Sequence, residues 1–228
     1  MIPLQDDRPS ALKPYVTISL IAACAAVFLW QRSLDITAGR RAIIALGAIP
    51  AVLLTDARLP HDLAWLPRYL TPFTSMFLHG GWMHLLGNML FLWIYGDNVE
   101  DALGRPRYLL FYVCCGIAAI FAQALSNPHS PYPIIGASGA ISGVLGAYLL
   151  LFPRAKVLTL VLLPFFFTTL RVPAMLLLPL WFAVQLVSDF AVSGGGGGVA
   201  FRAHIGGFLA GMLLAPMLKR SEVRLFAS

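Results

Sequence analysis

The sequence predicts an all-α polytopic membrane protein, folded as one bundle of six transmembrane helices. Two observations lead to this prediction. Hydrophobic side chains make up 59% of the 228 residues, and the mean hydropathy is +0.79. Charged side chains make up only 11%, less than half of the about 25% that a water-soluble domain carries. The surplus of apolar side chains must therefore face lipid, which excludes a soluble, fibrous or disordered protein.

The six helices follow from six apolar runs, since a transmembrane helix needs about 20 mostly apolar residues. We expect them at Pro14–Gln31, Trp82–Tyr95, Tyr108–Leu125, Ser138–Phe152, Val172–Val192 and Ala203–Leu218. A further apolar run, Val157–Leu170, contains Pro164, which would break a helix. We interpret this run as a connection that dips into the membrane face. The glycine run 194–198 is typical of a flexible linker between the last two helices.

The basic residues predict the orientation of the bundle, because Lys and Arg concentrate in cytoplasmic loops. With both termini inside, the inner side holds Arg8, Lys13, Arg105, Arg107, Arg154, Lys156, Arg171, Lys219, Arg220 and Arg224. The outer side holds the smaller set Arg32, Arg40, Arg41, Arg58, Arg68 and Arg202. We therefore expect a cytoplasmic segment 1–13, a single membrane domain 14–219 and a cytoplasmic tail 220–228. The net charge of +6 then reflects orientation, and no nucleic-acid partner is expected.

Polar side chains inside a bilayer are costly, so each is a candidate functional residue. His84 and Asn88 lie on the second predicted helix, Ser138 on the fourth and His204 on the sixth. With a rise of about 1.5 Å per residue, Asn88, Ser138 and His204 lie about 26, 24 and 22 Å from the basic residue at the inner end of their helices. Three helices therefore place a polar side chain at one depth, and His84 lies one turn away on the face of Asn88.

Small residues indicate which helices approach each other closely. Gly139 and Gly143 on the fourth helix, and Gly207 and Gly211 on the sixth, have the spacing of small-xxx-small faces. A close approach would let the short Ser138 side chain reach the imidazole of His204.

These residues predict a catalytic Ser/His dyad. A serine hydroxyl becomes a nucleophile when a base accepts its proton, which assigns Ser138 as nucleophile and His204 as general base. Asn88, His84 and the Ser138 backbone N–H would stabilise the oxyanion. No acid is placed against His204 by spacing, and Asp189 is the acid to check. Such a dyad needs neither a cofactor nor a metal.

Three segments resemble the motifs of the rhomboid family of intramembrane serine proteases, most of all its compact bacterial six-helix forms. They are TSMFLHGGWMHLLGN at Thr74–Asn88, GASG at Gly136–Gly139 and AHIGG at Ala203–Gly207. The resemblance extends from about Arg68 to Leu218. It implies the same roles for Ser138, His204, Asn88 and His84.

The resemblance also implies a function and a location. Partners would be the lipid bilayer and transmembrane protein substrates, which would be cleaved near the outer face after a small residue. The protein would be a multi-pass protein of the bacterial inner (plasma) membrane. One departure from the family pattern is visible in the first loop. Many members have Trp-Arg where this chain has Pro67-Arg68, with Trp65 nearby. The first loop is therefore expected to be anchored differently from that of those members.

Two other classes of function remain open at this point. One is a metal-dependent membrane hydrolase that would use His79, His84 and His204, although His79 and His84 are poorly aligned on one helix. The other is a non-proteolytic rhomboid-like protein that binds client helices. The presence of both Ser138 and His204 argues against that second class.

Overall fold

The structure, a computed structural model, describes residues 1–162, 167–191 and 200–226. The described elements include the short 3-10 helices η1 (Arg68–Leu70) and η2 (Ser75–Phe77). In chain order the strands and α-helices are β1 (Ile2–Asp6), α1 (Tyr15–Ser33), α2 (Ile36–Leu46), α3 (Pro50–Leu54), α4 (Thr71–Thr74), α5 (Trp82–Leu103), α6 (Arg105–Ser126), α7 (Ser138–Leu151), β2 (Lys156–Leu162), β3 (Phe167–Pro173), α8 (Ala174–Ala191) and α9 (Phe201–Leu218).

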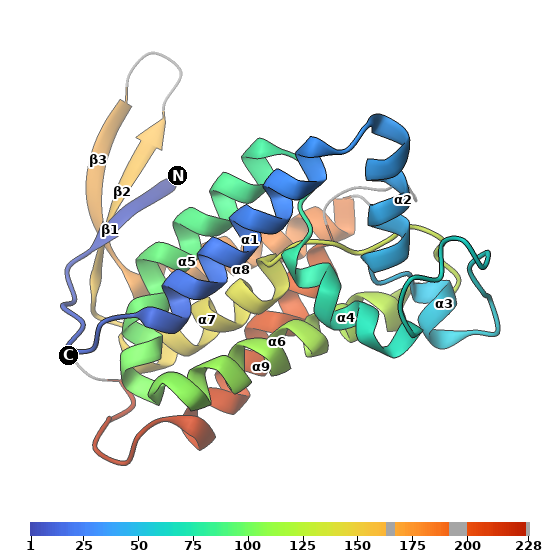
Figure 1. The fold of residues 1–228 in the computed structure, drawn as a ribbon. Helices are drawn as coiled ribbons and strands as arrows, with labels where there is room; N and C mark the ends of the chain where they lie inside the picture. The colour runs from blue at the N-terminus through green and yellow to red at the C-terminus, as the bar shows by residue number, and fades with distance from the viewer. Residues whose placement is uncertain (163–166, 192–199, 227–228) are drawn as a thin grey trace.

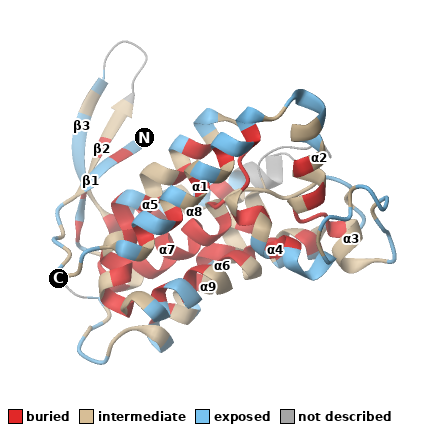
Figure 2. Cartoon of the chain, in the orientation of Figure 1, coloured by how far each residue is buried: buried red, intermediate tan, exposed pale blue. Residues whose placement is uncertain are grey.

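The long helices lie side by side and form one bundle (Figure 1). The strands and the chain termini gather at one end of this bundle, and α2, α3 and α4 gather at the other. Helix α7 lies at the centre, and nearly all of its side chains are buried (Figure 2). The residues that begin α7 are therefore enclosed by neighbouring helices.

Helices occur at all six predicted positions. Three of them, α1, α6 and α9, are long and apolar enough to cross a membrane by length and composition. Helix α7 and residues 174–187 of α8 are apolar but shorter. Helix α5 is 22 residues long and carries Asp97, Glu100 and Asp101 near its end. The count of six spans stays a prediction.

The protein is mostly helical, as expected, but the expectation that it contains no strands was wrong. Strands β1, β2 and β3 form an antiparallel sheet in that order, with Ile2 opposite Leu160 and Leu160 opposite Thr169. The run Val157–Leu170, which we interpreted as a connection dipping into the membrane face, mostly forms β2 and β3; Pro164 itself lies outside the described residues. The physical reason is composition, since Val and Thr favour a pleated strand and a proline excludes a continuous helix.

The first loop is anchored by Arg68, although Pro67 replaces the expected tryptophan. Arg68 Nη1 donates hydrogen bonds to the carbonyl oxygens of Val52 at 3.1 Å and Thr55 at 3.0 Å. These contacts tie η1 to the end of α3. Arg68 therefore anchors the first loop without a tryptophan at position 67.

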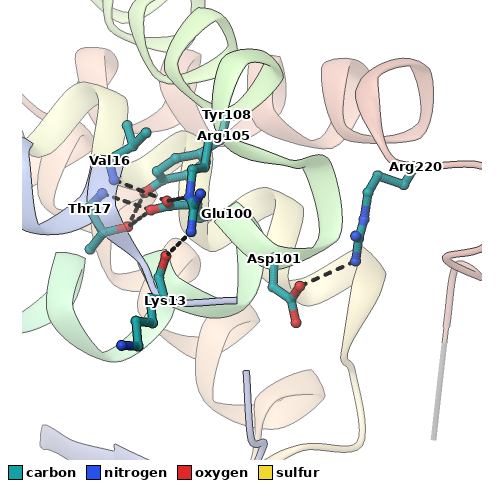
Figure 3. Close-up of polar contacts among 8 residues, drawn as sticks. All are labelled: Lys13, Val16, Thr17, Glu100, Asp101, Arg105, Tyr108 and Arg220. Atoms are coloured by element: carbon teal, nitrogen blue, oxygen red, sulfur yellow. Dashed lines mark hydrogen bonds and ion pairs between the residues drawn. The ribbon is translucent and has the colours of Figure 1, made fainter. Parts of the chain in front are cut away.

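A buried carboxylate joins α5 to the start of α1. Glu100 is fully buried and accepts hydrogen bonds from the backbone N–H of Val16 at 3.0 Å and of Thr17 at 2.8 Å, and from Thr17 Oγ1 at 2.8 Å (Figure 3). The Arg105 side chain lies 3.9 Å from the same carboxylate. The first N–H groups of a helix have no partner within that helix, and its dipole favours a negative charge there. Glu100 therefore caps α1 and fixes it against α5.

A second carboxylate ties the sheet to the bundle. Asp6 Oδ2 accepts hydrogen bonds from Asn98 Nδ2 at 3.0 Å and from the Tyr148 hydroxyl. Burial raises the pKa of Asp6 from 3.8 to about 6, and the nearby carboxylate of Asp97 acts in the same direction. A carboxyl whose pKa is higher in the folded protein than in the unfolded chain stabilises the fold at low pH. That contribution is lost as the pH rises from the unfolded value through about 6.

We expect Asp6→Asn to remove this pH dependence. Both donors bind the same oxygen of Asp6, so the amide oxygen of asparagine can accept both hydrogen bonds. The Tm of the variant in detergent should exceed that of wild type by more at about pH 7.5 than at about pH 5. Asp56→Asn, which changes an exposed carboxylate in the first loop, far from Asp6 in the chain, is the control. A difference between variant and wild type that is equal at both pH values would contradict the assignment.

Candidate active site

The loop before α7 requires a glycine at position 136. Gly136 has a φ of +115°, a conformation that side chains rarely adopt. A Cβ atom there would lie 2.6 Å from His84 Nε2 and 3.8 Å from Asn88 Nδ2. The backbone N–H of Gly136 donates to the Ser75 carbonyl oxygen at 2.9 Å. This glycine therefore lets the chain turn against α5 directly before Ser138 begins α7.

Glycines also let α7 and α9 pack backbone to backbone. A Cβ atom on Gly207 would lie 2.0 Å from the Gly139 carbonyl oxygen, and one on Gly211 would lie 2.0 Å from that of Gly143. Real Cβ atoms essentially never approach so closely, so both positions exclude larger residues. The predicted contact between the two glycine faces is confirmed.

This packing brings Ser138 and His204 together. His204 Nε2 lies 2.8 Å from Ser138 Oγ, within hydrogen-bond distance. Both side chains are partly buried. Ser142, one turn further along α7, donates its hydroxyl to the Ser138 carbonyl oxygen at 2.7 Å. Ser142 thus bonds within its own helix and does not contact the imidazole through a recorded hydrogen bond.

Asn88 and His84 line the same turn from α5. Asn88 is 8% exposed, and its Nδ2 has no hydrogen-bond partner among the described residues. A buried amide donor without a partner is costly, so it calls for an acceptor that binds there. His84 Nδ1 accepts a hydrogen bond from the Gly80 backbone N–H at 3.3 Å, which leaves Nε2 directed at Gly136. Two side-chain donors, Asn88 Nδ2 and His84 Nε2, therefore lie close to Gly136, which precedes Ser138 by two residues.

One polar side chain of the site was missed by the sequence analysis. Gln185 on α8 is buried, and its Oε1 lies 2.8 Å from His204 Nδ1. The signal was present, because Gln185 is a polar residue inside an apolar run and meets the criterion applied to the other candidates. The side chain of Asp189, the acid proposed for checking, lies outside the described residues, as does the glycine run 194–198.

The histidines do not assemble a metal site in the part of the chain that the structure describes. The rings of His79 and His84 are 5.1 Å apart, and His79 Nδ1 lies 3.2 Å from the Phe77 carbonyl oxygen. No group of three His, Cys, Asp or Glu side chains among the described residues is arranged to hold a metal ion. The geometry therefore favours the serine and histidine pair over a metal centre built from His79, His84 and His204.

Fold and site together define an integral membrane protein in which three helices converge on a serine, a histidine and an amide donor. A model of the Rhomboid domain family matches residues 67–221, which include all of these residues. The chain belongs to the rhomboid family.

Individual relatives resemble parts of the chain. It is 48% identical to Rhomboid protease GluP of Bacillus subtilis (strain 168) over 82 residues, which are 36% of this chain and 15% of that protein. It is 34% identical to Rhomboid-like protease 5 of Toxoplasma gondii over 148 residues, 61% of this chain and 15% of that protein. It is 30% identical to Presenilin-associated rhomboid-like protein A, mitochondrial, of Danio rerio over 139 residues, 55% of this chain and 36% of that protein. The chain thus spans less than half the length of these relatives.

Proposed function

We propose that this protein is an intramembrane serine endopeptidase that hydrolyses peptide bonds in or near the transmembrane segments of other membrane proteins. The observation that carries the proposal is the 2.8 Å contact between Ser138 Oγ and His204 Nε2. Nucleophilic catalysis requires a serine within hydrogen-bond reach of a base. Membership of the rhomboid family and the two relatives named as proteases support the same reaction class.

In the proposed reaction His204 Nε2 accepts the proton of Ser138 as Oγ attacks the scissile carbonyl carbon. The resulting oxyanion accepts hydrogen bonds from the Ser138 backbone N–H and from the side chains of Asn88 and His84. The protonated imidazole then donates its proton to the leaving amine, which leaves an acyl group on Ser138. Water activated by the same imidazole hydrolyses this ester and restores the free serine.

We propose that the sheet end of the bundle faces the cytoplasm and that α2, α3 and α4 lie at the outer face. The chain termini lie at the sheet end (Figure 1). Asp6 of β1 contacts Asn98 near the end of α5. Close to that end of α5, Arg105 contacts the Lys13 carbonyl oxygen and Arg220 contacts Asp101 (Figure 3). Basic residues favour the cytoplasmic side. The segment 1–13 and the tail 220–228 would then be cytoplasmic and residues 14–219 would form the membrane domain, in a bacterial inner membrane. The Ser138 site would lie toward the outer face, where substrates would be cleaved.

A serine-reactive fluorophosphonate tests the proposed function directly. Wild-type protein in detergent should be labelled at Ser138, mapped by mass spectrometry, and should cleave a co-expressed model transmembrane substrate. Ser142→Ala, which removes a hydroxyl one turn away on the same helix, should keep both activities. Labelling at a different residue would overturn the proposed mechanism. Cleavage that a chelator abolishes and added metal restores would favour a metal-dependent hydrolase, and an absence of both labelling and cleavage would favour a non-proteolytic protein that binds client helices.

A further inference from the structure

Gln185 reaches the site from a helix that carries neither the serine nor the histidine. Its Oε1 lies 2.8 Å from His204 Nδ1, and His204 Nε2 lies 2.8 Å from Ser138 Oγ. The three side chains therefore form a continuous hydrogen-bonded row from α8 through α9 to α7. Gln185 is 9% exposed, so little water competes for this contact.

The same face of α8 also contacts the imidazole ring through an aromatic side chain. Trp181 precedes Gln185 by four residues, which is close to one helical turn. Its ring lies 6.0 Å from the His204 ring, centroid to centroid, at 37°. Phe201 meets the ring edge-on at 6.5 Å. Aromatic rings thus lie on two sides of the imidazole. Within the part of the chain that the structure describes, its hydrogen-bond partners are Ser138 and Gln185.

The chemistry of an amide restricts how this row can be protonated. A glutamine oxygen accepts hydrogen bonds and cannot donate them, so the nitrogen facing it must carry the hydrogen. In a neutral imidazole the other nitrogen is then the acceptor. Here the other nitrogen is Nε2, which faces the Ser138 hydroxyl.

We propose that Gln185 is a positioning residue for the base of this site: its carbonyl oxygen holds His204 in the Nδ1–H tautomer and so directs the Nε2 lone pair at Ser138. This inference rests on the proposed function, in which His204 is the base. Gln185 would do for this imidazole what a buried aspartate does in Ser-His-Asp hydrolases, where the third residue fixes tautomer and orientation. Unlike aspartate, it would do so without placing a negative charge in the membrane interior.

The decisive variant is Gln185→Leu, which removes the acceptor and keeps most of the side-chain volume. We expect kcat to fall by about 10²-fold, the lower end of what a positioned general base contributes, with KM close to wild type. Gln185→Glu retains an oxygen that can accept from Nδ1–H, so it should recover most of the lost kcat.

Gln123→Leu provides a matched control. Gln123 on α6 makes the same kind of contact with α9, because its Oε1 accepts a hydrogen bond at 3.3 Å from the backbone N–H of Ala203. The contact is to the backbone next to His204 and not to its ring. Gln123→Leu therefore also removes an amide that contacts α9, but it leaves the His204 ring unchanged. Its kcat should stay close to that of wild type.

A spectroscopic measurement on the unaltered protein tests the proposal independently of any variant. The ¹⁵N chemical shifts of a neutral imidazole distinguish the Nδ1–H from the Nε2–H tautomer. The resonances of His204 are identified by their loss in His204→Ala. We expect the Nδ1–H tautomer in wild type and a mixture of tautomers in Gln185→Leu.

Three results would overturn the role of Gln185. They are a wild-type kcat in Gln185→Leu, a Gln185→Glu variant that folds but is as slow as Gln185→Leu, and an Nε2–H tautomer in wild type. The tautomer measurement decides the question if the leucine variant does not fold. Failure of the proposed function gives a different result, because then either Ser138→Ala would still cleave substrate or the wild-type protein would not cleave it, whatever Gln185 does.

Discussion

Ser138→Ala should abolish cleavage of a transmembrane substrate while leaving the protein folded. The substitution removes one oxygen atom at the start of α7, and alanine fits any space that serine occupies. The hydroxyl's hydrogen-bond partner is His204 Nε2, so its loss leaves one acceptor nitrogen without this partner and no unpaired donor. Removing the nucleophile of another serine protease costs about 10⁶-fold in kcat, and we expect a loss of that order, below the limit of most cleavage assays.

His204→Ala should be as inactive as Ser138→Ala, and the double variant should be no worse than either. Groups that act as one unit in catalysis show such non-additive losses. The measurement is the initial cleavage rate of a reconstituted model substrate, with Tm recorded for each variant. Ser142→Ala is the control, because Ser142 bonds only to the backbone of its own helix in the recorded contacts. Cleavage by Ser138→Ala above a few per cent of the wild-type rate would refute the proposed mechanism.

Helices α1 and α5 to α9 could be predicted because each contains a long apolar run, although α5 extends to Leu103, beyond the predicted Tyr95. The shorter helices α2, α3 and α4 of the first loop were not predicted. The contact between α7 and α9 was predictable from the glycines at positions 139, 143, 207 and 211. Small residues at this spacing let two membrane helices approach each other closely. The sheet could not be predicted in the same way. Strands β2 and β3 are short and apolar, and hydropathy alone does not distinguish such a strand from a buried helical segment. The pairing of β2 with β1 also joins residues far apart in sequence.

The candidate site was only partly accessible from the sequence, because spacing gives depth but not the rotation of each helix. Ser138, His204 and Asn88 were indicated by polarity at a common depth, and their catalytic roles stay predictions. Gln185 has the same polarity but was missed, because its partner depends on how α8 is turned toward α9. Glu100 was missed as a cap for a similar reason: its acceptors serve α1, on a segment more than eighty residues earlier in the chain. Such contacts are decided by tertiary packing rather than by local sequence.

Asn88→Ala should lower kcat by about 10²–10³-fold, equivalent to about 3–4 kcal/mol of transition-state stabilisation, with little change in KM. The reason is the unpartnered donor on Asn88 Nδ2, which is buried and lies near Gly136. In the resting protein it gains nothing from its position, since it has no recorded acceptor there. It would gain a hydrogen bond when negative charge develops on the substrate carbonyl oxygen. Interactions made only in the transition state raise kcat and leave substrate binding nearly unchanged.

The Ser138 and His204 pair would remain in Asn88→Ala, so a fluorophosphonate should still label the variant, though more slowly than wild type. Asn98→Ala is the matched control: it removes another buried amide from the same helix, at the end that contacts Asp6. Asn98→Ala is expected to lower Tm and to leave kcat unchanged. The kinetic constants kcat and KM must be measured separately with a reconstituted substrate. A normal kcat with a raised KM in Asn88→Ala would show that Asn88 holds substrate in place. If Asn88→Ala and Asn98→Ala lost kcat to the same extent and Tm to the same extent, Asn88 would only pack the helices.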